Sequence, residues 1–406
     1  MRKIGIVGAG QSGLQLAIGL RKAGHEVVLL SNQSAGQVRE GRVTSSQCMF
    51  DTALGRERDL GINFWDSECP RIDDVDFTIV SPEHTRALTW AAPLDAPAMS
   101  VDQRVKVPRW LGEFSRLEGE VRIQSAGIPE LERLAAECEL VVVAAGKGDV
   151  AGLFERDAER SPFSQPMRAL ALTYVRGLEP RPDRAAICFN VIPGIGEYFV
   201  FPALTTSGTC EIMVFEGLIG GPMDCWSGVQ SAAQHLEVSL DILRRFVPWE
   251  HARTRNVELT DPNGSLAGRF APTVRKPVAR LPSGRPILGM ADVVCLNDPI
   301  TGQGSNNAAK CAAEYLRAIL EAGDRAFDVE WMTATFESYW SYARFVTDWT
   351  NRMLLPPAPH VLALLGAGVT RPRVARWFAN AFDDPRRYFP QFADPAAAQR
   401  FIDDAA

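Results

Sequence analysis

The sequence lacks the features that mark membrane proteins and nucleic-acid binders. No apolar run approaches the roughly 18 residues of a spanning helix, and MRKIGIVGAG enters a predicted strand at once, leaving no room for a secretory leader. Nor is there a positive excess, since 43 lysines and arginines face 49 acidic residues, for a net charge of -6. Nucleic acid and anionic membranes are therefore poor candidate partners.

Neither the cysteines nor the histidines indicate a metal or catalytic site. The eight cysteines form no CxxC pair and no Cys/His group at metal-site spacing, which excludes a recognisable metal centre and favours a reducing cytoplasm. The five histidines are dispersed and no serine lies in a GxSxG context, so a serine hydrolase is not indicated. With 46% hydrophobic residues, the 406-residue chain can build two cores, or one domain inserted into another.

What the sequence does contain is a clear βαβ beginning. KIGIVG (3–8) is a short apolar run ended by glycine, SGLQLAIGLRKAG (12–24) has helical periodicity, and HEVVLLS (25–31) is typical of a second buried strand. A similar pair follows later, where IPELERLAAECE (128–139) predicts a helix and LVVVAAG (140–146) a buried strand. Both units indicate a parallel sheet.

A glycine fingerprint, GAGQSG, lies between that first strand and helix. Its first glycine permits a tight turn, its second lets a pyrophosphate approach the main chain, and its third allows close helix packing. The predicted dinucleotide contacts are Gly8, Gly10, Ser12 and Gly13. The acidic residue expected about 20 positions later is missing, because the second strand ends in SNQ (31–33), so the ribose contact must be weaker or come from elsewhere.

A second constellation, GMADVVCLNDPITGQGSNNAA (289–309), distinguishes FAD from NAD. Asp292, near a predicted strand end, can accept hydrogen bonds from ribityl hydroxyls. The glycines at 302 and 304 lead into a helix, for which Ser305 is the predicted N-cap and Gly323 the stop. Amides at that helix start can face the isoalloxazine edge that gains negative charge on reduction. Since NAD needs neither feature, FAD is favoured.

The distribution of residue types along the chain predicts three parts in an α/β fold. They are a Rossmann-like FAD-binding domain, a discontinuous, mostly antiparallel β-sheet substrate domain, and a helical C-terminal region. The aromatic residues between 331 and 349 are interpreted as packing rather than as a cofactor box. The predicted boundaries are 1–72, 102–160 and 284–323 for the FAD-binding domain, 73–101 and 161–283 for the substrate domain, and 324–406 for the C-terminal region.

In order and spacing these motifs resemble the flavoprotein monooxygenases of the p-hydroxybenzoate hydroxylase fold, and more closely the oxygenase component of styrene and indole monooxygenases. The resemblance runs nearly end to end through IGIVGAGQSGL, SVDQRVKVP, LVVVAAGKG, SPF, RALAL and DPITGQGSN. It implies that Arg42 closes over the flavin and that Arg104 lies beside it. The full set of implied cofactor residues beyond the fingerprint is Arg42, Ser46, Arg104, Asp292, Pro299, Gly302, Gln303, Gly304 and Asn306.

One departure from single-component hydroxylases concerns the source of electrons. Where those enzymes carry an Asp-Gly motif linked to FAD and NADPH, this chain has AAGKGDVAG (144–152), and GIGEYF (194–199) lacks the third glycine of a second dinucleotide site. Styrene-type oxygenases depart in the same way. The resemblance therefore implies an NAD(P)H-dependent flavin reductase as partner, supplying reduced FAD that reacts with O2. A homodimer is compatible with the sequence.

The predicted substrate wall is the stretch GRVTSSQCMF (41–50). If it runs extended, Ser45, Gln47 and Met49 share one face. Indole-type relatives show Ser, Gln and Met there, whereas styrene-type enzymes show Asn, Val and His. Val75 and Ala98 favour the indole type too, although Thr78 departs from the expected Ile. The prediction is epoxidation of the indole 2,3 double bond, leading to indigo, with styrene and aryl sulfides as further substrates.

Several alternatives stay open on the sequence. The chain can instead be a styrene monooxygenase proper or an aromatic hydroxylase. A flavin-dependent halogenase is disfavoured, because no WxWxIP motif is present and Lys147 lies in the wrong context. A two-dinucleotide reductase is disfavoured by the single complete fingerprint. A carrier of reduced flavin without enzymatic activity is the remaining reading.

Overall fold

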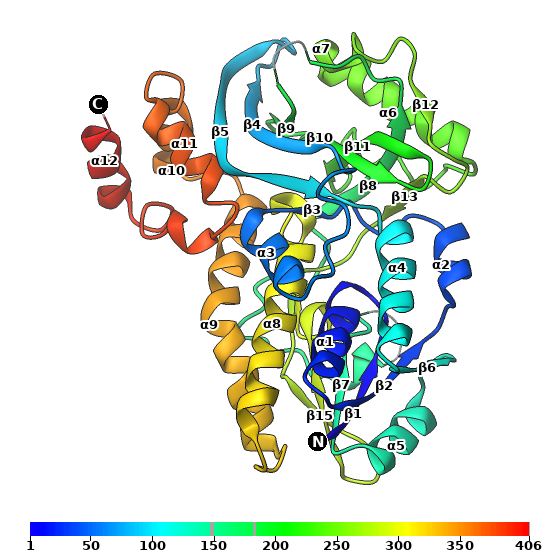
Figure 1. The fold of residues 1–406 in the computed structure, drawn as a ribbon. Coiled ribbons are helices and arrows are strands. Elements are labelled where there is room, and N and C mark those ends of the chain that lie inside the picture. The colour runs from blue at the N-terminus through cyan, green and yellow to red at the C-terminus, as the bar shows by residue number, and fades with distance from the viewer. Residues whose placement is uncertain (147–149, 182–183, 406) are drawn as a thin grey trace.

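The computed structural model describes residues 1–146, 150–181 and 184–405, and its first large sheet contains the N-terminal βαβ unit (Figure 1). The strand order is β15-β16-β7-β1-β2-β6, and all neighbours are parallel except β15 and β16. The strands are β1 (Lys3–Val7), β2 (Glu26–Ser31), β6 (Glu120–Ile123), β7 (Leu140–Val143), β15 (Val278–Arg280) and β16 (Pro286–Gly289).

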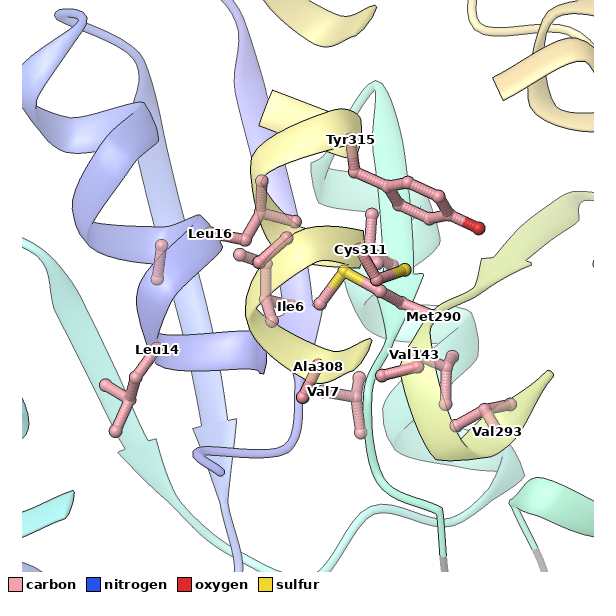
Figure 2. Close-up of a cluster of buried hydrophobic side chains, with 14 of the residues drawn as sticks. Ile6, Val7, Leu14, Leu16, Val143, Met290, Val293, Ala308, Cys311 and Tyr315 are labelled. Atoms are coloured by element: carbon pink, nitrogen blue, oxygen red, sulfur yellow. The ribbon is translucent and has the colours of Figure 1, made fainter. Parts of the chain in front are cut away.

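Helices enclose this sheet because β1 and β7 are apolar on both faces. Figure 2 shows the resulting core, where Ile6 of β1 and Val143 of β7 lie with Leu16, Cys311 and Tyr315 from the covering helices. The helices of this part are α1 (Gln11–Lys22), α2 (Ala35–Glu40), α3 (Asp51–Asp59), α4 (Gln103–Arg116), α5 (Ile128–Glu137) and α8 (Gly304–Ala322).

The second sheet has nine strands, eight of them in the order β12-β8-β11-β10-β9-β4-β5-β3, with β13 pairing to β8. All pairs are antiparallel except β4 with β9, which agrees with the mostly antiparallel sheet predicted. Its strands are β3 (Cys48–Met49), β4 (Arg71–Val80), β5 (Arg86–Ser100), β8 (Arg168–Arg176), β9 (Ala186–Ile192), β10 (Gly196–Thr205), β11 (Gly208–Leu218), β12 (Glu258–Leu259) and β13 (Ser265–Gly268).

The two faces of the second sheet pack against different partners. One face and the C-terminal helices form a single apolar cluster, whereas the other face packs against α6 and α7. The remaining elements are α6 (Ala232–Phe246), α7 (Pro248–His251), α9 (Val329–Met353), α10 (Pro359–Ala367), α11 (Pro372–Asn380), α12 (Pro395–Asp404), β14 (Thr273–Val274), β17 (Cys295–Leu296) and the 3-10 turns η1 (Ala151–Leu153), η2 (Ala291–Val293), η3 (Pro299–Thr301) and η4 (Pro385–Tyr388).

The aromatic stripe of α9 is packing, as predicted, since Phe336, Tyr339 and Trp349 are all at most 2% exposed. All eight cysteines are free thiols. Within the described ranges, every helix is too short or too polar to cross a bilayer.

The predicted fold class is confirmed, with local differences. β3 joins the second sheet although it lies inside the first predicted FAD-binding segment, and β15 joins the first sheet although it lies inside the predicted substrate domain. The N-cap of α8 is Gln303 rather than the predicted Ser305, because the helix begins at Gly304, whereas Gly323 ends it as expected.

Candidate functional site

Two helix N-termini without side-chain caps lie at one end of the molecule's first domain. The side chain of Gln15 on α1 donates to the carbonyl of Ala309 on α8 (Nε2 to O, 3.0 Å), and further along Gly19 lies against Leu316. The later residue of α1 contacts the later residue of α8, so the two helices run parallel and start at the same end. At neither N-cap, Gly10 nor Gln303, does a side chain accept a capping hydrogen bond from the helix, which leaves first-turn amides of both helices open to a ligand.

The glycines around these termini separate into two kinds. Gly8 has φ +110°, and a Cβ on Gly13 would lie 1.9 Å from the Gly8 carbonyl oxygen, so the turn itself requires both. A Cβ on Gly10 or on Gly304 would meet nothing within 4 Å. Glycines facing open space beside uncapped amides are what a pyrophosphate and a flavin ring need, and the residues present therefore fit FAD.

The carboxyl edge of the parallel sheet brings Asp292 to the same region. Ala291 in η2 has φ +52°, a left-handed conformation that costs a non-glycine residue about 1 kcal/mol and fixes the course of the chain into Asp292. A Cβ on Gly146, just after β7, would lie 2.8 Å from the Asp292 Cβ. Asp292 is exposed at this edge. The last two residues of the AAGKG motif, Lys147 and Gly148, lie outside the described residues.

The loop before α8 is held by its own side chains. Gly302 is left-handed (φ +63°), and the buried Gln303 donates through Nε2 to the carbonyl of Phe382 in the C-terminal region (3.0 Å). Asn306 accepts from the Phe50 amide and donates to the Cys48 carbonyl, both at 2.9 Å. These two amides therefore fasten the loop to β3 and to the C-terminal helices. Pro299, partly buried, opens η3.

The two predicted arginines differ in exposure. Arg104, 2% exposed, directs its guanidinium at Asp102 and Asp261 (Nε and Nη1 donors, each at 2.9 Å) and at the Thr205 hydroxyl (3.1 Å). A direct contact with a cofactor would require one of these bonds to break. Arg42 is exposed. Burial, chiefly, lowers the pKa of His235 on α6 to about 4, and the positive charge of Arg42 adds to that effect.

The predicted substrate wall is only partly strand. Residues 42–47 have no regular structure, because Tyr174 and backbone contacts rather than a neighbouring strand hold them, and only Cys48–Met49 pairs with β5. Ser45 Oγ donates to Gln47 Oε1 (2.6 Å), Gln47 Nε2 donates to Tyr174 Oη (3.0 Å), and Tyr174 Oη donates to the Ser45 carbonyl (2.8 Å). Ser46 is partly exposed.

Met49 leaves this wall and packs into the core of the first domain. Its sulfur accepts a hydrogen bond from Lys106 Nζ (3.2 Å). Lys106 in turn pairs with Glu57 at 2.6 Å, each side chain being 1% exposed, and Gln11 Nε2 donates to the same carboxylate (2.8 Å). This buried chain leads from Met49 to the first residue of α1. Sequence reasoning missed it, although a lysine on the buried face of an amphipathic helix is a detectable signal.

Val75 and Ala98 are fully buried in the apolar cluster of the second sheet, which also contains Tyr174 and Ile300 from η3. The structure thus places both in the same apolar cluster as Ile300 of the loop that precedes α8. Two cavities, of about 340 and 290 Å³, are lined by other residues, including Arg181 and Arg184. Thr78 lines the larger of them rather than the predicted substrate wall.

Comparisons with known proteins can now be set beside this geometry. Residues 146–253 match the family model described as "Styrene monooxygenase A putative substrate binding domain". The chain is 27% identical to proteins named styrene monooxygenase StyA from Pseudomonas fluorescens and from a Pseudomonas species, over 97% of this chain and 96% of each relative.

Solved structures of similar fold include the flavin-dependent brominase Bmp2 (TM-score 0.68, 13% identity, 99% of this chain and 98% of that one). Another is a flavoprotein/dehydrogenase from Cytophaga hutchinsonii (TM-score 0.70, 11% identity, 98% of this chain and 99% of that one). At these identities the likeness shows the fold alone.

The α/β fold is shared with flavin-dependent enzymes of known structure, and its two open helix N-termini fit a flavin cofactor. The similarity to the two Pseudomonas proteins goes one step further and supports a styrene monooxygenase-type flavoprotein, which is a flavin monooxygenase.

Proposed function

We propose that this chain is the oxygenase component of a two-component FAD-dependent monooxygenase and that it epoxidises indole at the 2,3 double bond, the reaction that leads to indigo. Styrene and aryl sulfides are its further substrates. An NAD(P)H-dependent flavin reductase supplies the reduced FAD, and O2 is the co-substrate.

Different residues would bind different parts of the FAD. The turn at Gly10 and the first-turn amides of α1 would hold the pyrophosphate, Asp292 would hold the ribityl chain, and the amides at Gly304 would hold the pyrimidine part of the ring. When bound, the reduced flavin supplies the oxygen-activating chemistry. The protein positions the aromatic substrate and excludes water, for which the apolar face containing Val75 and Ala98 is suited.

The observation that carries the choice of indole is the orientation of Gln47. Its Nε2 is engaged by Tyr174, and its Oε1 accepts one hydrogen bond from Ser45, so a second lone pair of Oε1 remains for a donor. The indole N–H is such a donor, whereas styrene has none. A site built to bind an N–H discriminates against a substrate that lacks it.

Styrene itself is the second candidate for the preferred substrate. It is favoured by the name of the two Pseudomonas relatives, which cover nearly the whole chain. The flavin-dependent halogenases enter only through likeness of fold.

The test is the product profile of the purified chain with externally reduced FAD, O2 and equal concentrations of indole, styrene and methyl phenyl sulfide. We expect indole to be consumed fastest, with blue pigment forming, and styrene oxide and sulfoxide to appear more slowly. The control omits the protein, because free reduced FAD produces hydrogen peroxide alone. Faster consumption of styrene would assign the chain to the second candidate, and hydrogen peroxide without any oxygenated product would overturn the proposal.

A further inference from the structure

Two buried carboxyl groups interact near the start of α8, one from the second sheet and one from the loop that precedes the helix. Glu216 on β11 is 0% exposed, and Asp298, directly before η3, is 1% exposed. The Asp298 Oδ1 accepts from the Ile300 amide (3.1 Å). Among the described residues, no N–H donor reaches either carboxyl oxygen of Glu216 or the second oxygen of Asp298. The side-chain interaction between the two carboxyls raises the pKa of Glu216 and favours the anion of Asp298, as expected for two carboxyls that share a hydrogen bond, and such a bond forms only if one of them carries a proton.

The charges that face this pair do not remove the need for a proton. Arg168 on β8 is the cation of the cluster, and Glu197 on β10 already holds it in a bidentate pair (2.8 and 3.0 Å). Three buried carboxyls thus share one guanidinium. Burial and then the charge of Asp298 hold the pKa of Glu216 well above its usual range. Burial raises the pKa of Asp298 as well, but the Glu216 side chain, the Ile300 amide and the charge of Arg168 all favour its anion, so Asp298 is the partner that ionises first.

We propose that Glu216 and Asp298 share a single proton at neutral pH, and that this hydrogen-bonded pair is a positioning device that ties the loop before α8 to the substrate sheet. Glu216 and Asp298 touch neither the substrate nor the reacting atoms. They act through the loop from Pro299 to Gln303, whose last residue caps α8.

The proton also limits negative charge behind the N-terminus of α8. If Glu216 ionises, two adjacent buried carboxylates repel each other across the junction between β11 and the loop. That repulsion pushes the loop away from the sheet and opposes any anionic group at the α8 amides. This last consequence rests on the proposed flavin site, whereas the shared proton does not.

The sign of the pH dependence follows from the raised pKa of Glu216. Between the ordinary pKa of a glutamate and this raised value, the folded protein holds a proton that the unfolded chain releases. The contribution to stability is complete below the unfolded pKa and is lost as the pH rises through the folded pKa. The protein without flavin should therefore lose stability as the pH rises from the ordinary pKa of a glutamate toward the raised pKa of Glu216.

The experiment measures the Tm of the flavin-free protein from pH 6 to pH 9.5 in the wild type, Glu216→Gln and Asp298→Asn. An amide in either position donates to the remaining carboxylate without a titrating proton, and asparagine still accepts from the Ile300 amide. We expect the wild type to lose about 3 °C or more across this range relative to either variant. The matched control is Glu258→Gln on β12, which neutralises an exposed carboxyl of the same sheet and should keep the wild-type slope.

Two further readouts separate a shared proton from a merely structural side chain. The infrared C=O band of a protonated carboxylic acid should be present at pH 7 in the wild type and in Glu258→Gln, and absent in Glu216→Gln and Asp298→Asn. The Kd for oxidised FAD should rise about tenfold from pH 7 to pH 9.5 in the wild type and less than twofold in Glu216→Gln.

An unchanged slope of Tm in both variants, or retention of the infrared band in both, would overturn the shared proton. A flat Kd combined with the expected Tm and infrared results would overturn the effect on the flavin site and leave the proton pair standing. Because Tm and the infrared band are measured without flavin or substrate, a failure of the proposed epoxidation leaves both results unaffected, and the two failures are distinguishable.

Discussion

The phenol oxygen of Tyr174 lies 3.0 Å from the amide nitrogen of Gln47, although 127 positions separate the two residues in the chain. Tyr174 is a strand residue of the second sheet, and Gln47 lies in the irregular connection between α2 and β3. The bond fixes which end of the Gln47 amide faces the apolar cluster and which is already used. The side chain that we propose carries the substrate preference is thereby oriented by a strand of the sheet rather than by its own irregular segment.

Tyr174→Phe removes this acceptor and also the donor to the Ser45 carbonyl. Because Gln47 then rotates freely, we expect the ratio of kcat/KM for indole to that for styrene to fall about 3- to 10-fold, in line with the loss of one or two hydrogen bonds of about 0.5–1.5 kcal/mol each. Styrene turnover itself should change little. The measurement is competition between the two substrates with externally reduced FAD.

The matched control is Tyr198→Phe. Tyr198 is equally buried in the same sheet but belongs to the opposite apolar cluster, and its hydroxyl has no partner among the described residues. Its removal should leave the substrate ratio unchanged. If both variants shift the ratio equally, general loosening of the sheet is responsible and the role of Tyr174 is wrong.

The structure separates two effects of exchanging Ser45, Gln47 and Met49 for the styrene-type residues. Ser45 and Gln47 form one hydrogen-bonded unit, whereas Met49 packs into the other core. We expect Ser45→Asn with Gln47→Val to reverse the indole preference without a third change. A product ratio equal to that of the wild type would remove the assignment of indole as preferred substrate.

Met49→His alone should act on stability instead. A histidine there replaces a thioether that accepts from Lys106 with a polar ring in an apolar core, which costs about 1–3 kcal/mol. We expect a lower Tm with an unchanged ratio of indole to styrene products. A changed ratio at unchanged Tm would place Met49 back in the substrate wall.

Local patterns predicted the fold because the elements that carry it are locally encoded. The apolar runs of β1 and β7 and the period of α1 needed no tertiary information, and the glycine at 13 is required by a contact only five residues away, with Gly8. The place of β3 in the second sheet was harder to predict, because its two residues gain their position from Asn306, which donates to the Cys48 carbonyl, and from pairing with β5, both distant in sequence.

The candidate site was less predictable for the same reason. Positions such as Gln47 were recognisable, but the partner that orients it, Tyr174, sits in a strand whose apolar residues gave no reason to single out one tyrosine. The carboxyl pair of Glu216 and Asp298 could not be predicted, since nothing in the sequence around either residue indicates that the fold brings the two together. Burial and contact between distant segments create both relationships, and periodicity records neither.

The buried pair of Lys106 and Glu57 predicts an asymmetric mutational response. Lys106→Met leaves the Glu57 carboxylate uncompensated in a site that is 1% exposed, so we expect a loss of about 3–5 kcal/mol in the free energy of unfolding. Adding Glu57→Gln should restore most of it, because no buried charge then remains. Chemical denaturation of the flavin-free protein measures both. The exposed pair of Arg176 and Glu258 is the comparison, and its loss should cost less than about 1 kcal/mol.

Gly10 and Gly13 give the sharpest test of the flavin site, because substitution by alanine should weaken FAD binding at Gly10 but destabilise the fold at Gly13. An alanine Cβ at Gly10 meets no protein atom within 4 Å, so the Tm of Gly10→Ala without flavin should stay within about 2 °C of the wild type, whereas the Kd for FAD should rise at least about tenfold as the methyl group occupies the approach of the pyrophosphate.

At Gly13 the added Cβ would lie 1.9 Å from the Gly8 carbonyl oxygen, so Gly13→Ala should destabilise the protein itself by about 1–3 kcal/mol before any ligand is added. Thermal unfolding without flavin, followed by FAD titration of whichever variants remain folded, separates the two effects. Unchanged FAD affinity in a stable Gly10→Ala protein would mean that the pyrophosphate does not approach this turn, and the open space above it would then need another occupant.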